Sequence, residues 1–172
     1  MSATTLAHFT TRAATVEDAA AIALIYNQGI ADRVATFETQ PRTAEQVTAW
    51  FDGVHPQVVV ERGGRVVAFG STSSYRARAC YAGIAEFSVY VEREERGKGA
   101  GRVAILALIT AAEAAGFWKL VSRVFVENTA SRRLLSAVGF REVGIYEKHG
   151  QLDGQWRDVV IVERLLGAAQ TA

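Results

Sequence analysis

Apolar side chains recur every three or four residues in four stretches of the chain, the spacing that puts them on one face of a helix. Hydroxyl residues open two of these stretches, at Thr15 and Thr43, where they suit helix N-caps. A glycine follows three of the stretches and suits the position just past a helix end. We therefore predict helices over residues 15–30, 43–51, 102–115 and 130–138.

Runs of β-branched and aromatic residues fill much of the remaining sequence and predict strands. They cover residues 58–61, 66–71, 84–91, 120–126, 140–146 and 156–166, and residues 75–83 form either a connection or a further strand pair. The order combines antiparallel hairpins with one strand–helix–strand crossover, which predicts an α/β fold with a sheet of mixed direction. No repeat or Pro/Ser-rich linker interrupts this order, so a single domain over residues 1–172 is expected.

Composition and charge exclude several classes of function. The 172 residues are 49% hydrophobic and 22% charged, which is enough to bury a sizeable core. A net charge of +1 gives no electrostatic reason for a nucleic-acid or membrane partner. Because Cys80 is the only cysteine, neither an internal disulfide nor a cysteine-based metal site is expected. The chain shows no signal peptide and no apolar run long enough to span a bilayer, so we expect a cytoplasmic protein.

The candidate chemistry begins in the loop Glu95–Gly101, which places three glycines and two cations between a predicted strand and a predicted helix. Free N–H groups at the start of a helix carry the positive end of its dipole. Glycines in turn let a ligand approach the backbone closely. A cradle for phosphate or pyrophosphate is therefore expected, with a plain glycine turn as the alternative. The dinucleotide-binding and Walker patterns are both absent.

The remaining pattern, R-G-x-G-x-G, resembles the pyrophosphate loop of the GNAT acyltransferase superfamily. Its residues are Arg96, Gly97, Lys98, Gly99, Ala100 and Gly101. A second segment, Val126–Phe140, resembles the superfamily's N-x-x-S-x-x-L-x-x-x-x-G-F segment and contains Asn128 and Ser131. For Asn128, a loop turn or a helix cap is the alternative interpretation.

This resemblance implies a mixed, mostly antiparallel sheet flanked by helices and split between its two central parallel strands. It also implies acetyl-CoA as the cosubstrate and no metal. In proteins of this superfamily the first central strand binds the pantetheine arm through its backbone, which corresponds here to Val89 and Val91. Asn128 and Ser131 would contact the same cosubstrate, and no covalent enzyme intermediate would be needed, because holding amine and thioester together does most of the work.

Three further segments, residues 34–43, 75–91 and 148–159, resemble the branch of phosphinothricin, arsinothricin and methionine-sulfone N-acetyltransferases. That resemblance implies acetylation of the α-amine of a small acidic amino-acid analogue, resistance to it, and a homodimer. Arg76 and Arg78 would lie on one side of an extended segment and bind acidic groups of the substrate. Phe37 would belong to the substrate pocket. Two solvated arginines and a core aromatic are the alternatives.

Glu86 matches the glutamate of the branch's E-x-x-V-Y-V segment and is the predicted general base. The alternatives are a carboxylate that faces solvent and a salt-bridge partner for an arginine. Leu135 stands where relatives carry a tyrosine or histidine that protonates the leaving thiolate, so water, Tyr90 or another residue would serve. Acetylation of a peptide or protein N-terminus or of a metabolic amine, and a coenzyme A-binding sensor without turnover, stay open as other functions.

Overall fold

The computed structural model describes residues 8–171, which fold around one seven-stranded sheet of order β1-β2-β3-β4-β5-β7-β6. The strands are β1 (Thr10–Ala13), β2 (Gln57–Arg62), β3 (Arg65–Ser74), β4 (Ile84–Val91), β5 (Lys119–Phe125), β6 (Arg141–Leu152) and β7 (Gln155–Leu165). Neighbouring strands are antiparallel except β4 and β5, which are parallel. The predicted mixed, mostly antiparallel sheet is therefore confirmed.

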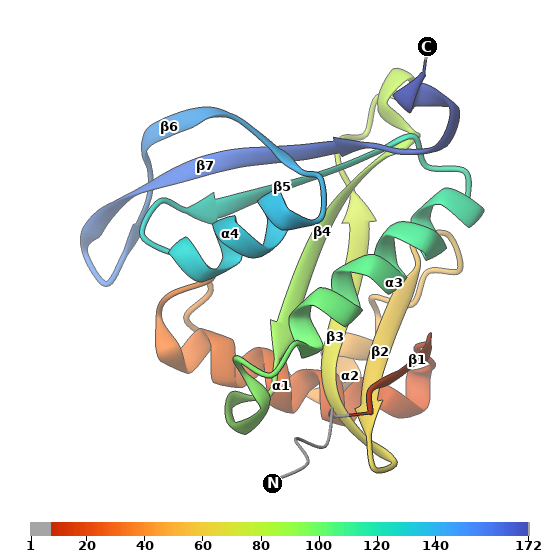
Figure 1. The fold of residues 1–172 in the computed structure, drawn as a ribbon. Coiled ribbons are helices and arrows are strands. Elements are labelled where there is room, and N and C mark those ends of the chain that lie inside the picture. The colour runs from red at the N-terminus through yellow and green to blue at the C-terminus, as the bar shows by residue number, and fades with distance from the viewer. Residues whose placement is uncertain (1–7, 172) are drawn as a thin grey trace, which may run out of the picture.

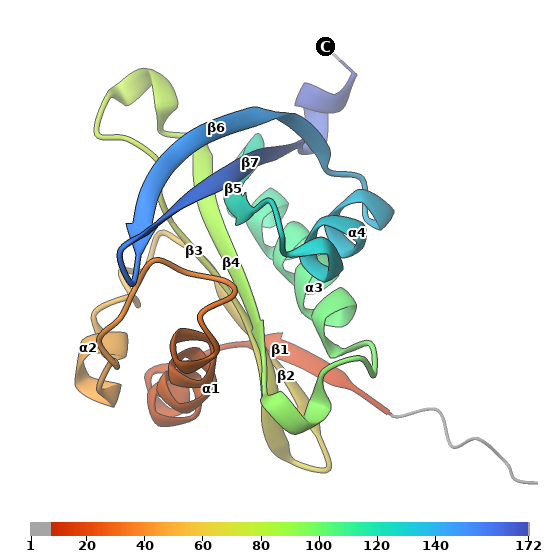
Figure 2. The ribbon, with the colours of Figure 1, turned by 90° about the vertical axis from the view of Figure 1, so that its left-hand side faces the viewer.

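Helices cover both faces of the sheet (Figures 1 and 2). Helices α1 (Ala19–Asp32) and α2 (Ala44–Thr48) lie on one face, and α3 (Ala100–Ala114) and α4 (Thr129–Ala137) lie on the other. In α3 the buried residues Ala104, Ile105 and Leu108 follow the spacing of one helix face, which explains why α3 packs flat on the sheet. None of the helices within residues 8–171 is long and apolar enough to cross a membrane.

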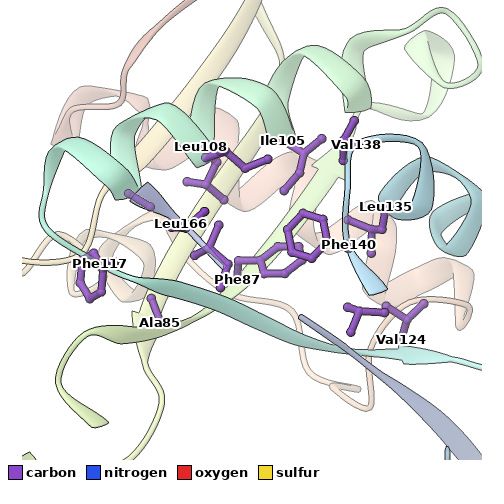
Figure 3. Close-up of a cluster of buried hydrophobic side chains, with 14 of the residues drawn as sticks. Ala85, Phe87, Ile105, Leu108, Phe117, Val124, Leu135, Val138, Phe140 and Leu166 are labelled. Atoms are coloured by element: carbon purple, nitrogen blue, oxygen red, sulfur yellow. The ribbon is translucent and has the colours of Figure 1, made fainter. Parts of the chain in front are cut away.

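Two main apolar clusters hold these layers together. Figure 3 shows the larger one, in which Phe87 and Phe140 meet at 4.8 Å between ring centroids, beneath Ile105 of α3 and Leu135 of α4. The second cluster joins α1 and α2 to the opposite face of β2 and β3. Burying these side chains supplies about 25 cal/mol for each Å² of apolar surface removed from water. Strand β4 contributes side chains to both clusters, so packing on both faces of the sheet fixes its position.

The sequence patterns missed β1 and underestimated β6. All four residues of β1 are exposed, so it carries no alternation of apolar and polar residues. It is tied to its surroundings by Arg12, which pairs with both Asp18 and Glu61 at 2.7 Å. Strand β6 was predicted to end at residue 146 but continues to Leu152. The prediction was too short because β6 is an edge strand, and its exposed polar residues do not show the alternating pattern of a half-buried strand.

Other boundaries differ by smaller amounts. Helix α2 ends at Thr48 rather than near residue 51, and its predicted cap is confirmed by a bond from Gln46 N to the Thr43 hydroxyl. Helix α3 begins at Ala100, two residues before its predicted start. Residues 75–83 form neither a strand nor a strand pair: they bend, and Ala79–Tyr81 makes one 3-10 turn. The connection that was the alternative is therefore confirmed, and Arg76 and Arg78 lie in it rather than in a regular strand, although the backbone of Arg78 is extended.

Candidate active site

The two central parallel strands separate after three residues. Their pairing runs from Ile84 opposite Lys119 to Glu86 opposite Val121, and beyond that point β4 and β5 diverge (Figure 1). A cavity of about 570 Å³ lies in the resulting gap and is lined by both strands, the first turn of α3 and the first turn of α4. Its lining contains eight of the predicted cofactor residues: Val89, Val91, Arg96, Gly97, Gly99, Gly101, Asn128 and Ser131.

The backbone of β4 presents hydrogen-bonding groups to this gap. The Val91 carbonyl accepts a bond from Arg96 Nε at 3.2 Å, so the polar groups of Val91 point away from β3. Successive residues of a strand direct these groups to alternate edges, which places the groups of Val89 on the same side as those of Val91. Because β5 has moved away by this point, Val89 has no partner strand on that edge. A ligand in the gap can take the place of the missing strand.

The glycine loop adopts backbone conformations that are unfavourable for residues with a side chain. Gly97 and Gly99 have φ angles of +75° and +98°, in the left-handed region that favours glycine. Gly99 is the N-cap of α3, so the first amides of that helix point out of the helix without intrahelical partners. A Cβ on Gly101 would lie 3.2 Å from Leu134 Cδ2 and 3.4 Å from Val91 Cγ2. These positions bring backbone N–H groups to the wall of the cavity.

The charged residues of the loop are already engaged. Arg96 Nη1 pairs with Asp32 at the end of α1 at 2.6 Å, and Arg93 binds the other oxygen of the same carboxylate. Burial disfavours ionisation of Asp32, yet the bonds from Arg93 and Arg96 lower its pKa. Arg96 thus fixes the loop against α1 and β4 and lines the cavity at the same time. Lys98 lies 3.6 Å from Glu95 and outside the cavity wall.

Ala100 and Arg102, in the first turn of α3, have different surroundings. Ala100 is buried at the start of α3 and packs with Val60 and Val67 of the sheet rather than lining the cavity. Arg102 lines the cavity from the same turn, is exposed, and forms no ion pair with any residue in the range 8–171. Arg102 was not predicted as a site residue because it lies beyond the glycine motif, although its place in the first turn of a predicted helix was a usable signal.

Asn128 joins the cavity wall to a distant loop. Its Oδ1 accepts the Ser131 amide at 3.2 Å and caps α4, which confirms the helix-cap interpretation. Its Nδ2 donates to the Val34 carbonyl at 3.3 Å, in the loop between α1 and α2. Val34 also lines the cavity, so the Asn128 side chain fixes α4 and this loop relative to each other on the two sides of the gap.

Glu86 lies at the last paired position before the strands separate. Its Oε1 accepts a bond from Arg123 Nη2 at 2.7 Å, and the two side chains are 31% and 48% exposed. The salt-bridge interpretation of Glu86 is thus confirmed. Glu86 is not among the residues that line the cavity, and its role as general base stays a prediction. Arg123 lines the cavity and was missed by the sequence analysis. A lone arginine in the apolar run LVSRVFV was the signal that could have found it.

The three predicted substrate residues lie apart from the cavity lining. Phe37 packs edge-on against Phe125 at 4.9 Å between ring centroids and belongs to a small apolar cluster with Leu152. Arg76 and Arg78 are exposed, each with its guanidinium beside a tyrosine ring. They follow the end of β3, where Ser73 pairs with Glu86. Their roles in substrate binding stay predictions.

Comparison with known proteins decides the family. Residues 23–140 match the model of the acetyltransferase (GNAT) family. The chain belongs to that family. It is 32% identical to a phosphinothricin N-acetyltransferase of Alcaligenes faecalis over 94% of this chain and 85% of that one. It is 31% identical to the L-methionine sulfoximine/L-methionine sulfone acetyltransferase of Pseudomonas paraeruginosa, over 94% and 96% of the two chains.

A solved GNAT structure gives the same result for the fold. The phosphinothricin acetyltransferase of Sinorhizobium meliloti, in complex with acetyl-CoA, superposes with a TM-score of 0.87 at 28% identity, over 95% of this chain and 91% of the other. The protein is therefore a GNAT N-acetyltransferase of the phosphinothricin and methionine sulfoximine branch, which uses acetyl-CoA.

Two side chains bear on the protonation of the leaving thiolate in this GNAT site. Leu135 is buried, lines the cavity and has no proton to donate. Tyr90 also lines the cavity and is held between Tyr26 and Phe69, at 5.0 and 5.6 Å between ring centroids. Burial, reinforced by Tyr26, raises the pKa of Tyr90, so its hydroxyl keeps its proton. Among residues 8–171 no group of three or more His, Cys, Asp or Glu side chains could hold a metal ion.

Proposed function

We propose that the protein acetylates the α-amino group of a small acidic amino-acid analogue such as phosphinothricin, arsinothricin or methionine sulfone, and thereby confers resistance to it. Support comes from two relatives that are named for acceptors of this kind and match most of the chain at 31–32% identity. The single observation that carries the proposal is the gap between β4 and β5, which has Glu86 at its closed end and the glycine loop at its open end.

The cosubstrate would occupy the cavity in the gap. Outward-pointing amides at the start of α3 suit a pyrophosphate, because they carry the positive end of the helix dipole. The edge of β4 at Val89 and Val91 suits the amides of a pantetheine arm, which can pair with it as a strand would. Asn128 and Ser131 complete the opposite wall. Acetyl-CoA supplies the activated acetyl group, and the protein holds it next to the amine.

Glu86 acts as the general base in this proposal. An α-ammonium group must lose a proton before its nitrogen can attack, and a carboxylate at the closed end of the gap can receive that proton directly or through one water. As the new C–N bond forms and the C–S bond breaks, the thiolate takes up a proton. Tyr90 and water are the two sources, and a Tyr90→Phe variant that retains the rate assigns that proton to water.

The acceptor would be held on the side of the sheet that carries α1. Arg76 and Arg78 are exposed cations near the β3 end, close in the chain to the strand pair that positions Glu86. Planar guanidinium forks match carboxylate, phosphinate and arsinate oxygens. Phe37 packs on Phe125, four residues beyond the last paired position of β5, and offers an apolar wall further along the gap. These features favour an anionic acceptor over a polycationic one.

Release of free thiol from acetyl-CoA tests the proposal with a panel of acceptors: phosphinothricin, arsinothricin, methionine sulfone, glutamate, a short peptide and a polyamine. Turnover confined to the acidic amino-acid analogues is the expected result. Turnover with the peptide alone would contradict the substrate and keep the cosubstrate. Acetyl-CoA binding without turnover on any acceptor would favour a coenzyme A-binding sensor.

The proposal includes a homodimer. Strand β6 forms the edge of the sheet, and its residues from Arg141 to His149 are all exposed. Large apolar side chains are among the exposed ones on this hairpin, including Ile145, Tyr146 and Trp156. A second copy would cover this surface, since long exposed apolar edges promote association. Sedimentation velocity gives the mass, and a monomer at enzyme-assay concentrations would contradict the dimer.

A further inference from the structure

A charged pair lies across the split at the point where β4 and β5 separate. Arg123 of β5 reaches Glu86 of β4 with Nη2 at 2.7 Å from Oε1. The proposed mechanism uses Glu86 and leaves Arg123 without a role. Arg123 lies in the wall of the cavity that the cosubstrate would occupy. A purely structural partner for Glu86 would not need to face that cavity.

Strand register puts both charges on the acceptor side of the sheet. Glu86 is opposite Val121, so their side chains share a face, and Arg123 is two residues further along β5 on that same face. Phe125 follows after two more residues and is covered by Phe37 from the loop between α1 and α2. One face of the gap therefore presents a carboxylate, a guanidinium and an aromatic wall in sequence.

A ligand can displace the ion pair between Glu86 and Arg123 at low cost. Both side chains are part exposed, and ion pairs in such surroundings are weak because water competes for each charge. Arg123 uses only Nη2, and its Nε and Nη1 have no hydrogen-bond acceptor among residues 8–171. A carboxylate that approaches this fork can take two parallel N–H bonds, the strongest geometry available to arginine.

We propose that Arg123 binds the α-carboxylate of the acceptor while Glu86 receives the α-ammonium group. This inference rests on the proposed function and names how the same site recognises its substrate. An α-amino acid carries a positive and a negative group on one carbon atom, so it complements an adjacent Glu–Arg pair and takes the place of the bond between them. The ammonium group is thereby brought to the carboxylate that deprotonates it.

Such a clamp selects against amines that lack a free α-carboxylate. A peptide N-terminus carries a neutral amide in that position, which leaves the Arg123 fork with a poorer acceptor and loses the charge-assisted bonds. The clamp thus separates the proposed substrate class from peptide or protein N-termini. It also leaves Arg76 and Arg78 for the distal phosphinate, arsinate or sulfone oxygens of the analogue, since the α-carboxylate is bound elsewhere.

Matched acceptors and matched variants test the clamp. Thiol release is measured with L-methionine sulfone and with its carboxamide, on wild type, Arg123→Gln, Arg123→Lys and Arg141→Gln. Arg141 is a suitable control because it is also a strand arginine that pairs with a carboxylate on the neighbouring strand, and it lies outside the cavity. Arg123→Lys keeps a cation beside Glu86 and removes the planar fork.

The wild type should prefer the carboxylate acceptor, and Arg123→Gln should lower kcat/KM for it by about 10- to 100-fold, mainly through KM. The same variant should change kcat/KM for the carboxamide and KM for acetyl-CoA by less than about twofold, and Arg123→Lys should fall between. Equal losses on both acceptors would show that Arg123 only positions Glu86 and would overturn the clamp. No preference in the wild type would overturn it too, while turnover of L-methionine sulfone itself still upholds the proposed function.

If the wild type acetylates neither acceptor but does acetylate a peptide, the proposed function fails, and the clamp fails with it before any variant is needed. If the wild type prefers the carboxylate and Arg123→Gln keeps that preference, the clamp fails alone. The two failures are therefore distinguishable.

Discussion

The two sides of the split are built by different means. On the cofactor side, the glycine loop and the first turn of α3 form one continuous segment, and its backbone groups point into the cavity. On the proposed acceptor side, Glu86, Arg123, Phe37 and Arg76 come from four separate segments, and their side chains would bind and deprotonate the acceptor. A backbone site can be encoded locally, whereas a side-chain site exists only after the sheet has formed.

The largest expected effect belongs to the acceptor side. Glu86→Gln should lower kcat by about 10²- to 10⁴-fold, because the amide cannot take the proton from the ammonium group. KM for acetyl-CoA should stay the same if the two sides are independent. Steady-state thiol release checks this, with Glu142→Gln as the control for loss of a carboxylate in an exposed ion pair outside the cavity. A wild-type rate in Glu86→Gln would remove the base from the mechanism.

The reverse pattern is expected on the cofactor side. Gly99→Ala places a Cβ at φ +98° and distorts the loop, so KM for acetyl-CoA should rise by about tenfold. KM for the acceptor should change little. Gly64→Ala is the matched control, because Gly64 has φ +76° in a hairpin turn outside the cavity. Equal effects of both variants on KM would mean that general strain, rather than the loop, is being measured.

Asn128 connects the two sides, so its loss should affect both by a smaller amount. Asn128→Ala removes the cap of α4 and the bond to Val34. A lost cap costs about 1 kcal/mol, which corresponds to a fall in Tm of about 2–4 °C for a chain of this size. Both KM values should rise about two- to fivefold, by the rule that a missing hydrogen bond weakens binding modestly. Differential scanning calorimetry and kinetics measure the two effects, and Asn128→Asp, which keeps the cap acceptor, should restore the Tm alone.

The smallest effect on activity is expected far from the split. Bonds from the His55 amide and ring and from the Val54 amide lower the pKa of Asp52 to about 2. A carboxyl whose pKa falls on folding stabilises the protein above its unfolded pKa, near 4, and this contribution is lost as the pH falls toward 2. The difference in Tm between wild type and Asp52→Asn should therefore shrink between about pH 4 and pH 2. A constant difference across that range would contradict the ionised role of Asp52, and neither KM should change at pH 7.

Particular residues show how far the sequence could predict this site. The glycine loop was found because its function depends on neighbouring residues, and eight of ten predicted cofactor residues line the cavity. Ala100 does not, because the helix begins at that residue and turns its side chain into the core. Arg123 was missed because its importance depends on pairing across the split with a residue 37 positions away.

The fold followed the same division. Strands with one buried face could be predicted from their apolar residues, whereas β1 and the end of β6 are exposed edges with no such pattern. The sequence by itself determined the order of the elements after β1, the family and the position of the glycine loop, because these depend on local periodicity and motif. Only the tertiary structure decided where β4 and β5 part, which charge meets Glu86, and where Arg76 and Phe37 lie, because these depend on contacts between segments far apart in the chain.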